Sequence, residues 1–374
     1  MTDTPLLLAY LCWTLGALIL SWCAPTRWQP IGIATCGIAL LAHLAPLSLL
    51  FLATSTLVTF AVVQWYPTGR PALLASITIL AGGYLSCMLS AQQTGEGIAT
   101  TLILPLGMAY YTLRLIHYMF ESFKGTLREH SFSEYLCYQF LPATLPVGPI
   151  HRFDEFTRDL RRRRWDASLF VSGNRRVIYG LAKIIIIGNY LLDIKLEGQF
   201  QAWAHQPGVI GVYFSAIIFW LRLYIMFSGF SDLAVGLSAM MGFRIRENFN
   251  WPFLSRNISE FWQRWHISLS TWCRDYVYTP VLASGRSHSL AVISSMVVLG
   301  LWHEPSLRYI LWGAYHGLGI TLYRAFSARA SNAIDTLPAP LKIIWQCAAI
   351  LITLHFVLFS FPVTQSIEHW LIGK

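Results

Sequence analysis

"VIGVYFSAIIFWLRLYIMF" (residues 209–227) decides the fold class, because its 19 residues carry a single charge and are long enough to cross a bilayer core as a helix. Comparable apolar runs occupy residues 5–23, 46–66 and 72–90. Over all 374 residues the chain is 55% hydrophobic and 12% charged, about half the charge of an average globular protein. Backbone polar groups cannot stay unpaired in lipid, so the sequence predicts an all-α, polytopic membrane protein.

The remaining apolar runs extend this pattern along the whole chain. Further spans are predicted at 99–120, 177–192, 289–302, 309–325 and 341–361, which gives about nine to eleven membrane helices. The shorter run at 31–43 could instead be re-entrant. The first run has no basic region before it and no small-residue cleavage site after it, so we expect an uncleaved span.

No long linker or internal repeat interrupts the pattern, which predicts a single membrane-embedded domain over residues 1–374. Two regions, 121–176 and 243–288, mix aromatic and charged residues over lengths unlike ordinary loops. We expect their helices to lie along the membrane interface or to dip partway into it.

The positive charge is concentrated in one connecting segment. Between Arg152 and Arg176 stand eight of the 27 Lys and Arg residues, including the run Arg161 to Arg164. The positive-inside rule places this loop in the cytoplasm, where it would also meet anionic lipid headgroups. A loop flanked by membrane spans argues against nucleic-acid binding.

The cysteines and common catalytic motifs exclude several kinds of chemistry. The seven cysteines are scattered without a Cys-x-x-Cys pair, which predicts neither a disulfide framework nor a zinc site. Gly-x-Ser-x-Gly, His-Glu-x-x-His and Walker motifs are absent from the sequence. The sequence therefore predicts no metal site and no bound cofactor.

Asp232, in "FSGFSDLAVG", stands within a predicted span. A carboxylate at membrane depth is costly and is treated as functional by default. It could equally cap a helix broken after Gly229, by accepting hydrogen bonds from backbone N–H groups. Both interpretations remain open from the sequence.

His266 stands among charges and tryptophans in "ENFNWPFLSRNISEFWQRWHISLSTWCRDYVYTP" (247–280). Read as one helix, this stretch is amphipathic, with Trp262 and Leu269 near the histidine. Tryptophan favours the membrane interface, so an interfacial anchor helix around Trp262, Trp265 and Trp272 is one interpretation. A site built around His266 is the other.

Two more histidines change that balance. In "VLGLWHEPSLRYILWGAYHG" (298–317), His303 ends an uncharged apolar run and His316 follows one helix later. A single histidine in an apolar span is usually an interhelical hydrogen-bond partner, which is our first interpretation of His316. Together, however, the three histidines could line one buried cavity. An imidazole there would serve as a general base, because its pKa of ~6.5 lets it accept a proton near neutral pH.

These stretches are similar to the membrane-bound O-acyltransferase (MBOAT) family, in particular to its bacterial branch that O-acetylates alginate and related polysaccharides. The segment from Phe227 to Pro280 resembles the most recognisable block of that branch. Residues 104–125, 140–156, 300–317 and 355–371 resemble its other blocks in the same order, so the similarity covers roughly residues 100–371.

The resemblance implies a helical funnel that holds a tunnel, with the acyl donor entering from the cytoplasm and the acceptor from the other side. It implies that His303 is the catalytic histidine and that His266 is its companion. The chain departs from the family pattern at Glu304 and Pro305, where a small residue commonly follows the catalytic histidine. Its end soon after the last matching block makes it closer in length to the relatives that move D-alanine to teichoic acids.

The sequence thus predicts an O-acyltransferase of the bacterial inner membrane that moves an acyl group, most simply acetyl, to a hydroxyl of an exported or surface glycan. His303 is the expected base, and His266 positions a substrate. Acetyl-CoA or an acyl carrier protein is the expected donor, and a periplasmic esterase-like protein is a possible partner. Residues expected to support the site are Asp232, Asn250, Trp265, Arg274 and His316. The alternatives are D-alanyl transfer from a carrier protein and a transporter or flippase.

Overall fold

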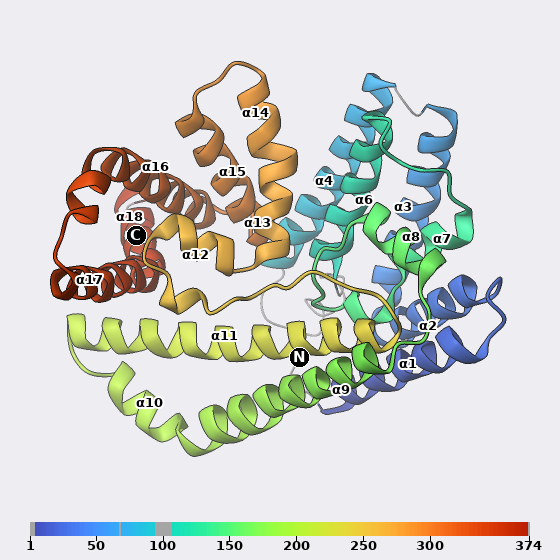
Figure 1. The fold of residues 1–374 in the computed structure, drawn as a ribbon, viewed down its shortest axis with the longest axis horizontal. Coiled ribbons are helices and arrows are strands. Elements are labelled where there is room, and N and C mark those ends of the chain that lie inside the picture. The colour runs from blue at the N-terminus through green and yellow to red at the C-terminus, as the bar shows by residue number, and fades with distance from the viewer. Residues whose placement is uncertain (1–3, 67–68, 94–106, 373–374) are drawn as a thin grey trace. The chain divides into compact units, whose positions relative to one another are not determined.

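The computed structural model describes residues 4–66, 69–93 and 107–372. These residues form helices joined by turns and loops, and none of them forms a strand (Figure 1). The predicted all-α fold class is confirmed. Up to residue 181 the elements are α1 Thr4–Cys23, α2 Gln29–Leu44, α3 Pro46–Trp65, α4 Arg70–Gln93, α6 Met108–Phe123, α7 Phe132–Gln139, η1 Pro142–Thr144, α8 Phe153–Arg162 and α9 Ala167–Leu181.

The rest of the chain begins with a π-helix that continues α9 directly. The elements are η2 Ala182–Lys195, α10 Glu197–Ala204, α11 Val209–Met240, η3 Pro252–Leu254, α12 Ile258–Arg264, α13 Ile267–Cys273, η4 Arg274–Tyr278, α14 Thr279–Ala283, α15 His288–His303, α16 Leu307–Asp335, α17 Ala339–Leu358 and α18 Ser360–Ile372.

Contacts between residues divide the chain into two compact units. Unit 1 comprises Met1–Asn189 and Met226–Arg246, and unit 2 comprises Tyr190–Ile225 and Glu247–Lys374. The single membrane domain expected from the sequence stays a prediction.

Five helices of the described chain are long and apolar enough to cross a membrane, which makes this a multi-pass membrane protein. Large apolar side chains are exposed on them, as the continuous helix α9–η2 shows: Ile178 is 56% exposed and Ile186 is 59% exposed. The five are Pro5–Cys23, Pro46–Trp65, Ala167–Lys195, Val209–Met240 and Ala339–Leu358.

Shorter apolar helices occupy Gln29–Leu44, Leu73–Ser86 and His288–His303. They correspond to the predicted segments at 31–43, 72–90 and 289–302. The first part of the predicted span 99–120 lies outside the described residues. The total of nine to eleven membrane segments stays a prediction.

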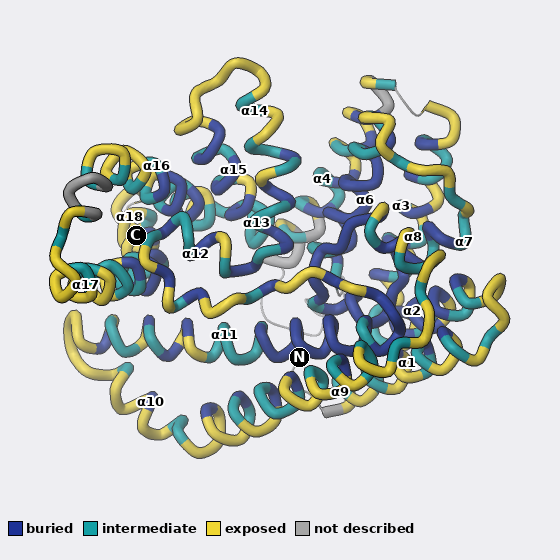
Figure 2. The backbone as a smooth tube through the Cα atoms, in the orientation of Figure 1, coloured by how far each residue is buried: buried dark blue, intermediate teal, exposed yellow. Residues whose placement is uncertain are grey.

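In unit 1, α9 and the C-terminal part of α11 run side by side (Figure 1). Residues 228–238 of α11 are all buried (Figure 2). Glycines permit this close approach, because a Cβ on Gly180 would lie 2.7 Å from the carbonyl oxygen of Gly229 on α11. Small residues at a helix crossing let backbones approach closely within a membrane, where packing drives association.

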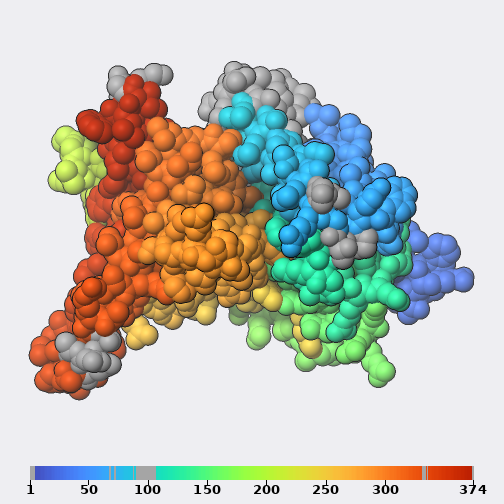
Figure 3. All heavy atoms as spheres, turned by 90° about the horizontal axis from the view of Figure 1, so that it is seen from above, coloured from blue at the N-terminus to red at the C-terminus, as the bar shows by residue number. Residues whose placement is uncertain are grey.

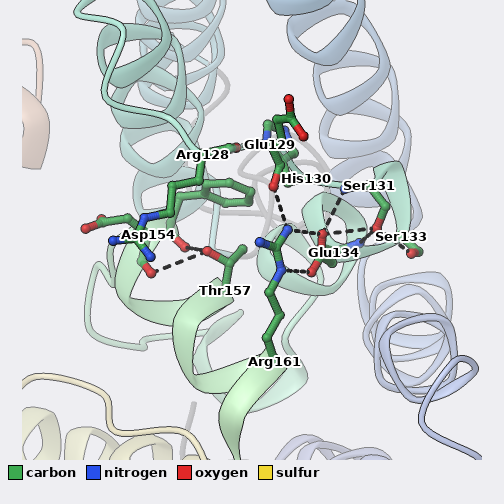
Figure 4. A network of polar contacts seen from close by, with 10 residues as sticks. Arg128, Glu129, His130, Ser131, Ser133, Glu134, Asp154, Thr157 and Arg161 are labelled. Atoms are coloured by element: carbon green, nitrogen blue, oxygen red, sulfur yellow. Dashed lines mark hydrogen bonds and ion pairs between the residues drawn. The ribbon is translucent and has the colours of Figure 1, made fainter.

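The short helices α7 and α8 of unit 1 are joined by a polar network (Figure 4). Ser131 and Glu134 form a capping box at the start of α7, which satisfies backbone N–H groups that a helix leaves unpaired. Arg161 of α8 donates to both carboxylate oxygens of Glu134, at 2.5 and 2.8 Å, and to the carbonyl oxygen of Glu129 at 2.6 Å. Together these bonds hold α7 and α8 in a defined arrangement.

In unit 2, α15 and α16 form a tight helical hairpin, and the orange atoms in Figure 3 include those of both helices. A Cβ on Gly300 would lie 2.1 Å from the carbonyl oxygen of Tyr309, and one on Gly313 would lie 2.3 Å from that of Met296. Only glycine therefore fits at these positions without moving the backbone. This close packing brings the end of α15 against the first turns of α16.

Candidate active site

His266 lies at a sharp break between α12 and α13. Its backbone is left-handed, with φ 45° and ψ 51°, a region that non-glycine residues rarely adopt. Asn248 fixes this break, because its Oδ1 accepts a hydrogen bond from Ser268 N at 3.2 Å and its carbonyl oxygen accepts one from Ile267 N at 3.0 Å. Strained backbone of this kind clusters at active sites, where surrounding contacts hold it in place.

His303 is the last residue of α15, and Glu304 ends that helix in extended backbone. The hairpin of α15 and α16 surrounds the imidazole with aromatic rings. Its centroid lies 5.8 Å from the ring of Tyr309, in a stacked arrangement, and 5.7 Å from the ring of Trp312, edge to face. The orientation of this histidine therefore depends on the close packing of two helices.

The two histidines lie next to each other within unit 2. Their ring centroids are 6.5 Å apart, and both rings contact Trp302, at 5.5 Å for His266 and 4.7 Å for His303. His266 is only 1% exposed. Burial lowers the pKa of His266, and the neighbouring His303 lowers it further, so its imidazole is neutral at physiological pH.

His316 joins the same aromatic cluster from the middle of α16. It is fully buried, and its Nδ1 accepts a hydrogen bond from Trp262 Nε1 at 3.4 Å. The ring of Trp312 lies 4.8 Å from His316 and 5.7 Å from His303. The structure therefore brings His266, His303 and His316 together from separate elements, as the sequence suggested. It also gives His316 the interhelical hydrogen bond expected of a packing histidine.

The other residues predicted to support the site lie in different surroundings. Trp265 is buried, and its ring contacts those of Trp220 and Phe261. Asn250 is exposed and pairs through its backbone N–H with the carbonyl oxygen of Arg264. Arg274 is exposed and pairs with Asp275 at 3.1 Å.

Asp232 belongs to unit 1, where its carboxylate pairs with two basic side chains. Its carboxylate accepts from Arg176 Nε at 2.8 Å and from Lys183 Nζ at 2.6 Å, which joins α9 and η2 to α11. The interpretation that Asp232 caps a broken helix is wrong, because α11 runs without a break from Val209 to Met240. The two basic side chains compensate a carboxylate that would be costly to bury unpaired.

The single amphipathic anchor helix predicted around His266 is not formed. His266 is not inside a helix, because the chain breaks there into two helices of seven residues each. Trp262, Trp265 and Trp272 are 4 to 6% exposed, so they pack inside the protein and do not face lipid. The amphipathic pattern arises because a folded interior, like a lipid interface, selects aromatic residues.

Sequence reasoning missed Asn248, Tyr309 and Trp312. Asn248 is completely buried two residues before the predicted Asn250, and both stand in "ENFN", so only the pairing across the break distinguishes them. Tyr309 and Trp312 stand three residues apart, at helical spacing, at the start of α16. That spacing was visible in the sequence, but the fold-back of α16 onto α15 was not.

Among the described residues, no three His, Cys, Asp or Glu side chains are close enough to hold a metal ion. The six cysteines whose side chains the structure describes are free thiols. The histidine cluster itself offers acid–base chemistry by imidazole.

Known acyltransferases share sequence with this chain. The chain is 34% identical to the probable alginate O-acetylase AlgI of Pseudomonas aeruginosa over 268 residues, which cover 70% of this chain and 50% of that protein. It is 32% identical to the teichoic acid D-alanyltransferase of Bacillus subtilis, over 70% of this chain and 68% of that protein. It is 28% identical to the peptidoglycan O-acetyltransferase of Helicobacter pylori, over 68% and 53%.

The chain spans about half the length of the alginate O-acetylases that it matches. The family model for membrane-bound O-acyltransferases (MBOAT) matches residues 6–361. That match begins well before residue 100, where the resemblance was expected to start. Because this match covers most of the chain, the chain belongs to the membrane-bound O-acyltransferase family.

Proposed function

We propose that the protein is an O-acyltransferase of the bacterial cytoplasmic membrane that moves an acetyl group to a hydroxyl of an exported or surface polysaccharide. The observation that supports this most is the pair of imidazoles, His266 and His303, held 6.5 Å apart in an aromatic cluster. Alginate and peptidoglycan O-acetyltransferases among the relatives support acetyl as the acyl group and a glycan as the acceptor.

The chemistry assigns a different task to each histidine. The acyl donor is a thioester, acetyl-CoA or an acyl carrier protein. His303 accepts the proton of the acceptor hydroxyl while its oxygen bonds to the thioester carbonyl carbon. The carbon–sulfur bond then breaks, and the imidazolium returns the proton to the leaving thiolate. His266, held by Asn248, positions one of the two substrates beside this base.

The aromatic surroundings favour this step. A water-poor site strengthens hydrogen bonds and keeps water from competing with the acceptor hydroxyl for the acyl group. Trp302, Tyr309 and Trp312 contact the His303 ring and cover part of it, which leaves His303 half-buried. Asp232 remains a candidate for support through the helices it joins. The proposed partner is a periplasmic esterase-like protein that passes the group on to the final glycan.

A second candidate is D-alanyl transfer from a carrier protein to a teichoic-acid-like polymer. It is favoured by the Bacillus subtilis relative, two thirds of whose length the chain covers. The same base and the same attack on a thioester carbonyl serve both reactions, so the acyl donor distinguishes them.

Replacing His303 tests the proposal. General-base assistance is worth ~10² to 10⁴ in rate, so His303→Ala should lose acetyl transfer by that factor. His303→Gln should fail as well, because an amide forms hydrogen bonds but does not accept a proton at neutral pH. The assay is transfer from labelled acetyl-CoA to glycans of a deletion strain, with protein level measured by immunoblot.

His288 provides a matched control, because it is the first residue of the same helix and is exposed. His288→Gln should keep wild-type transfer at equal protein level. Near-normal transfer by His303→Gln would show that the base lies elsewhere, with His266 as the next candidate. Transfer of D-alanine but not of acetyl by the wild type would favour the second candidate.

A further inference from the structure

A cavity of about 690 Å³ lies within unit 1, at the arginine loop (residues 161–166) that joins α8 to α9. Its wall is formed by the end of α8, this loop, the first turn of α9, and the segment that follows α11. Its size is that of a site for a small ligand. The cavity is basic, because its lining includes five arginines: Arg158, Arg162, Arg163, Arg164 and Arg244.

Two aspartates in the lining offset only part of this charge, and both already have partners in the protein. Asp159 accepts a hydrogen bond from the backbone N–H of Arg244 at 2.9 Å. Asp166 caps α9, where its Oδ1 accepts from Ser168 N at 2.9 Å and from Leu169 N at 3.2 Å. Five guanidinium groups against two carboxylates leave an excess of three positive charges on the cavity wall.

One of the five arginines has a structural task. Arg163 donates to the carbonyl oxygen of Met241 at 2.7 Å and to Gln29 Oε1 at 2.6 Å, so it joins the loop to two other segments of unit 1. Arg162 and Arg164 differ from it, because both are exposed and their side chains form no hydrogen bond or ion pair within the described chain. Their charges are therefore available to a ligand.

Helix electrostatics and membrane topology explain only part of this arrangement. Basic side chains are favoured in the last turn of a helix, which accounts for Arg162 at the end of α8. Arg164 lies beyond that helix, and Arg244 comes from the segment after α11. The positive-inside rule concerns charges along the chain and does not require them to gather around one cavity. Because like charges repel, such a gathering favours an anion between them.

The cavity lies at the level of the lipid headgroups. Its lining residues Ala167 and Leu169 belong to the first turn of the membrane span Ala167–Lys195. At about 1.5 Å per residue this span of 29 residues is roughly 40 Å long, the thickness of a bilayer with its headgroup layers. With each end of the span in one headgroup layer, the positive-inside rule places the cavity at the cytoplasmic leaflet.

Apolar surface begins directly beside the cavity. Trp165 lines it and is 57% exposed, and tryptophan favours the membrane interface. Val171, one helical turn after Ala167, is 64% exposed. A ligand in the cavity therefore meets guanidinium groups and, next to them, apolar side chains. A phosphate that carries acyl chains suits both, because guanidinium groups bind phosphate oxygens through paired hydrogen bonds.

We propose that this cavity binds the headgroup of an anionic phospholipid from the cytoplasmic leaflet, with preference for a headgroup that has two phosphates, as cardiolipin has. Basic pockets on the cytoplasmic side of membrane helices suit such headgroups. Arg162, Arg164 and Arg244 pair with the phosphate oxygens, and Trp165 contacts the start of an acyl chain. Two phosphates offset more of the excess charge than one does. No step of the proposed acyl transfer uses these residues, so the two proposals stand or fall separately.

Lipid binding by the purified full-length protein tests the assignment. The protein is freed of copurified lipid by detergent exchange and titrated with cardiolipin, phosphatidylglycerol or zwitterionic phosphatidylethanolamine, and binding is measured by native mass spectrometry. We expect cardiolipin to bind most tightly and phosphatidylethanolamine least tightly. This order is measured on the wild type and needs no variant.

The double variant Arg162→Gln/Arg164→Gln removes two charges from the cavity. It should weaken cardiolipin binding about thirtyfold, because each basic residue near an anionic membrane surface contributes about fivefold. Cardiolipin should also raise the unfolding temperature of the wild type more than that of this variant. Size exclusion checks that the variant is folded.

Arg286→Gln/Arg324→Gln is the matched control. Both arginines are exposed and lie outside the cavity lining, so the loss of the same two charges should leave cardiolipin binding unchanged. Equal losses in the two double variants would show that net charge binds the lipid, which would overturn the assignment.

Coenzyme A serves as a further probe, because it carries phosphates in a water-soluble molecule. If it displaces cardiolipin from the wild type and binds weakly to Arg162→Gln/Arg164→Gln, the cavity holds a soluble phosphate ligand and the lipid assignment is wrong. The assignment also fails if the cavity variant binds cardiolipin like the wild type, or if the wild type binds phosphatidylethanolamine as tightly as cardiolipin. Tighter binding of phosphatidylglycerol than of cardiolipin would contradict the preference for two phosphates.

Discussion

At the scale of single residues, the left-handed backbone of His266 is the most unusual feature of the site. A side chain with a Cβ costs about 1 to 2 kcal/mol in this conformation, whereas glycine adopts it freely. We therefore expect His266→Gly to be more stable than His266→Ala, although both lose the imidazole. Thermal unfolding in detergent, followed by size exclusion, measures the difference.

His316 serves as the control, because the opposite order of stability is expected there for the glycine and alanine variants. It lies in the middle of α16, where glycine is about 1 kcal/mol worse than alanine. His316→Ala should therefore be the more stable variant of that pair. The same order at both positions would contradict the left-handed backbone at His266. In either order, His316 variants should lower stability more than transfer, since Trp262 loses its hydrogen-bond partner.

At the scale of elements, the α15–α16 hairpin sets the orientation of His303. Gly313→Ala would place a Cβ 2.3 Å from the carbonyl oxygen of Met296, so the helices must separate. Overpacking of this kind costs about 1 to 3 kcal/mol, and it moves Tyr309 and Trp312 away from the histidine. We expect a lower unfolding temperature and reduced transfer per folded molecule.

Gly82→Ala is the matched control for this variant, because a Cβ at Gly82 on α4 meets nothing within 4 Å. It should leave transfer unchanged and keep or slightly raise stability, since alanine restricts the unfolded chain more than glycine does. Full activity of Gly313→Ala at wild-type stability would contradict the close packing of α15 and α16.

At the scale of the whole molecule, the arginine loop predicts the membrane topology. Arg164→Cys should react with a membrane-impermeant thiol reagent only from the cytoplasm, because Lys- and Arg-rich loops stay inside. Gln206→Cys, beyond the span Ala167–Lys195, should react only from the outside. The background is a variant without the exposed Cys12, Cys23 and Cys347. Labelling of Arg164→Cys from the periplasm, or of both sites from one side, would overturn this topology.

The sequence by itself determined the class of the protein and its candidate histidines. Apolar runs of membrane length are a property of consecutive residues, so they predict an all-α membrane protein without knowledge of the fold. His303 at the end of an apolar run, and His266 in a charged aromatic stretch, stand out for the same reason.

Only the tertiary structure decided which residues meet. The contact of His266 with His303 depends on a helix break fixed by Asn248 and on a hairpin closed by Gly300 and Gly313. These are interactions between distant segments, which local composition does not encode. The pairing of Asp232 with Arg176 and Lys183 likewise joins residues far apart in the sequence, so only the tertiary structure shows it. The burial of Trp262, Trp265 and Trp272 was also visible only in the tertiary structure, because a sequence pattern of aromatic residues is the same whether lipid or protein covers them.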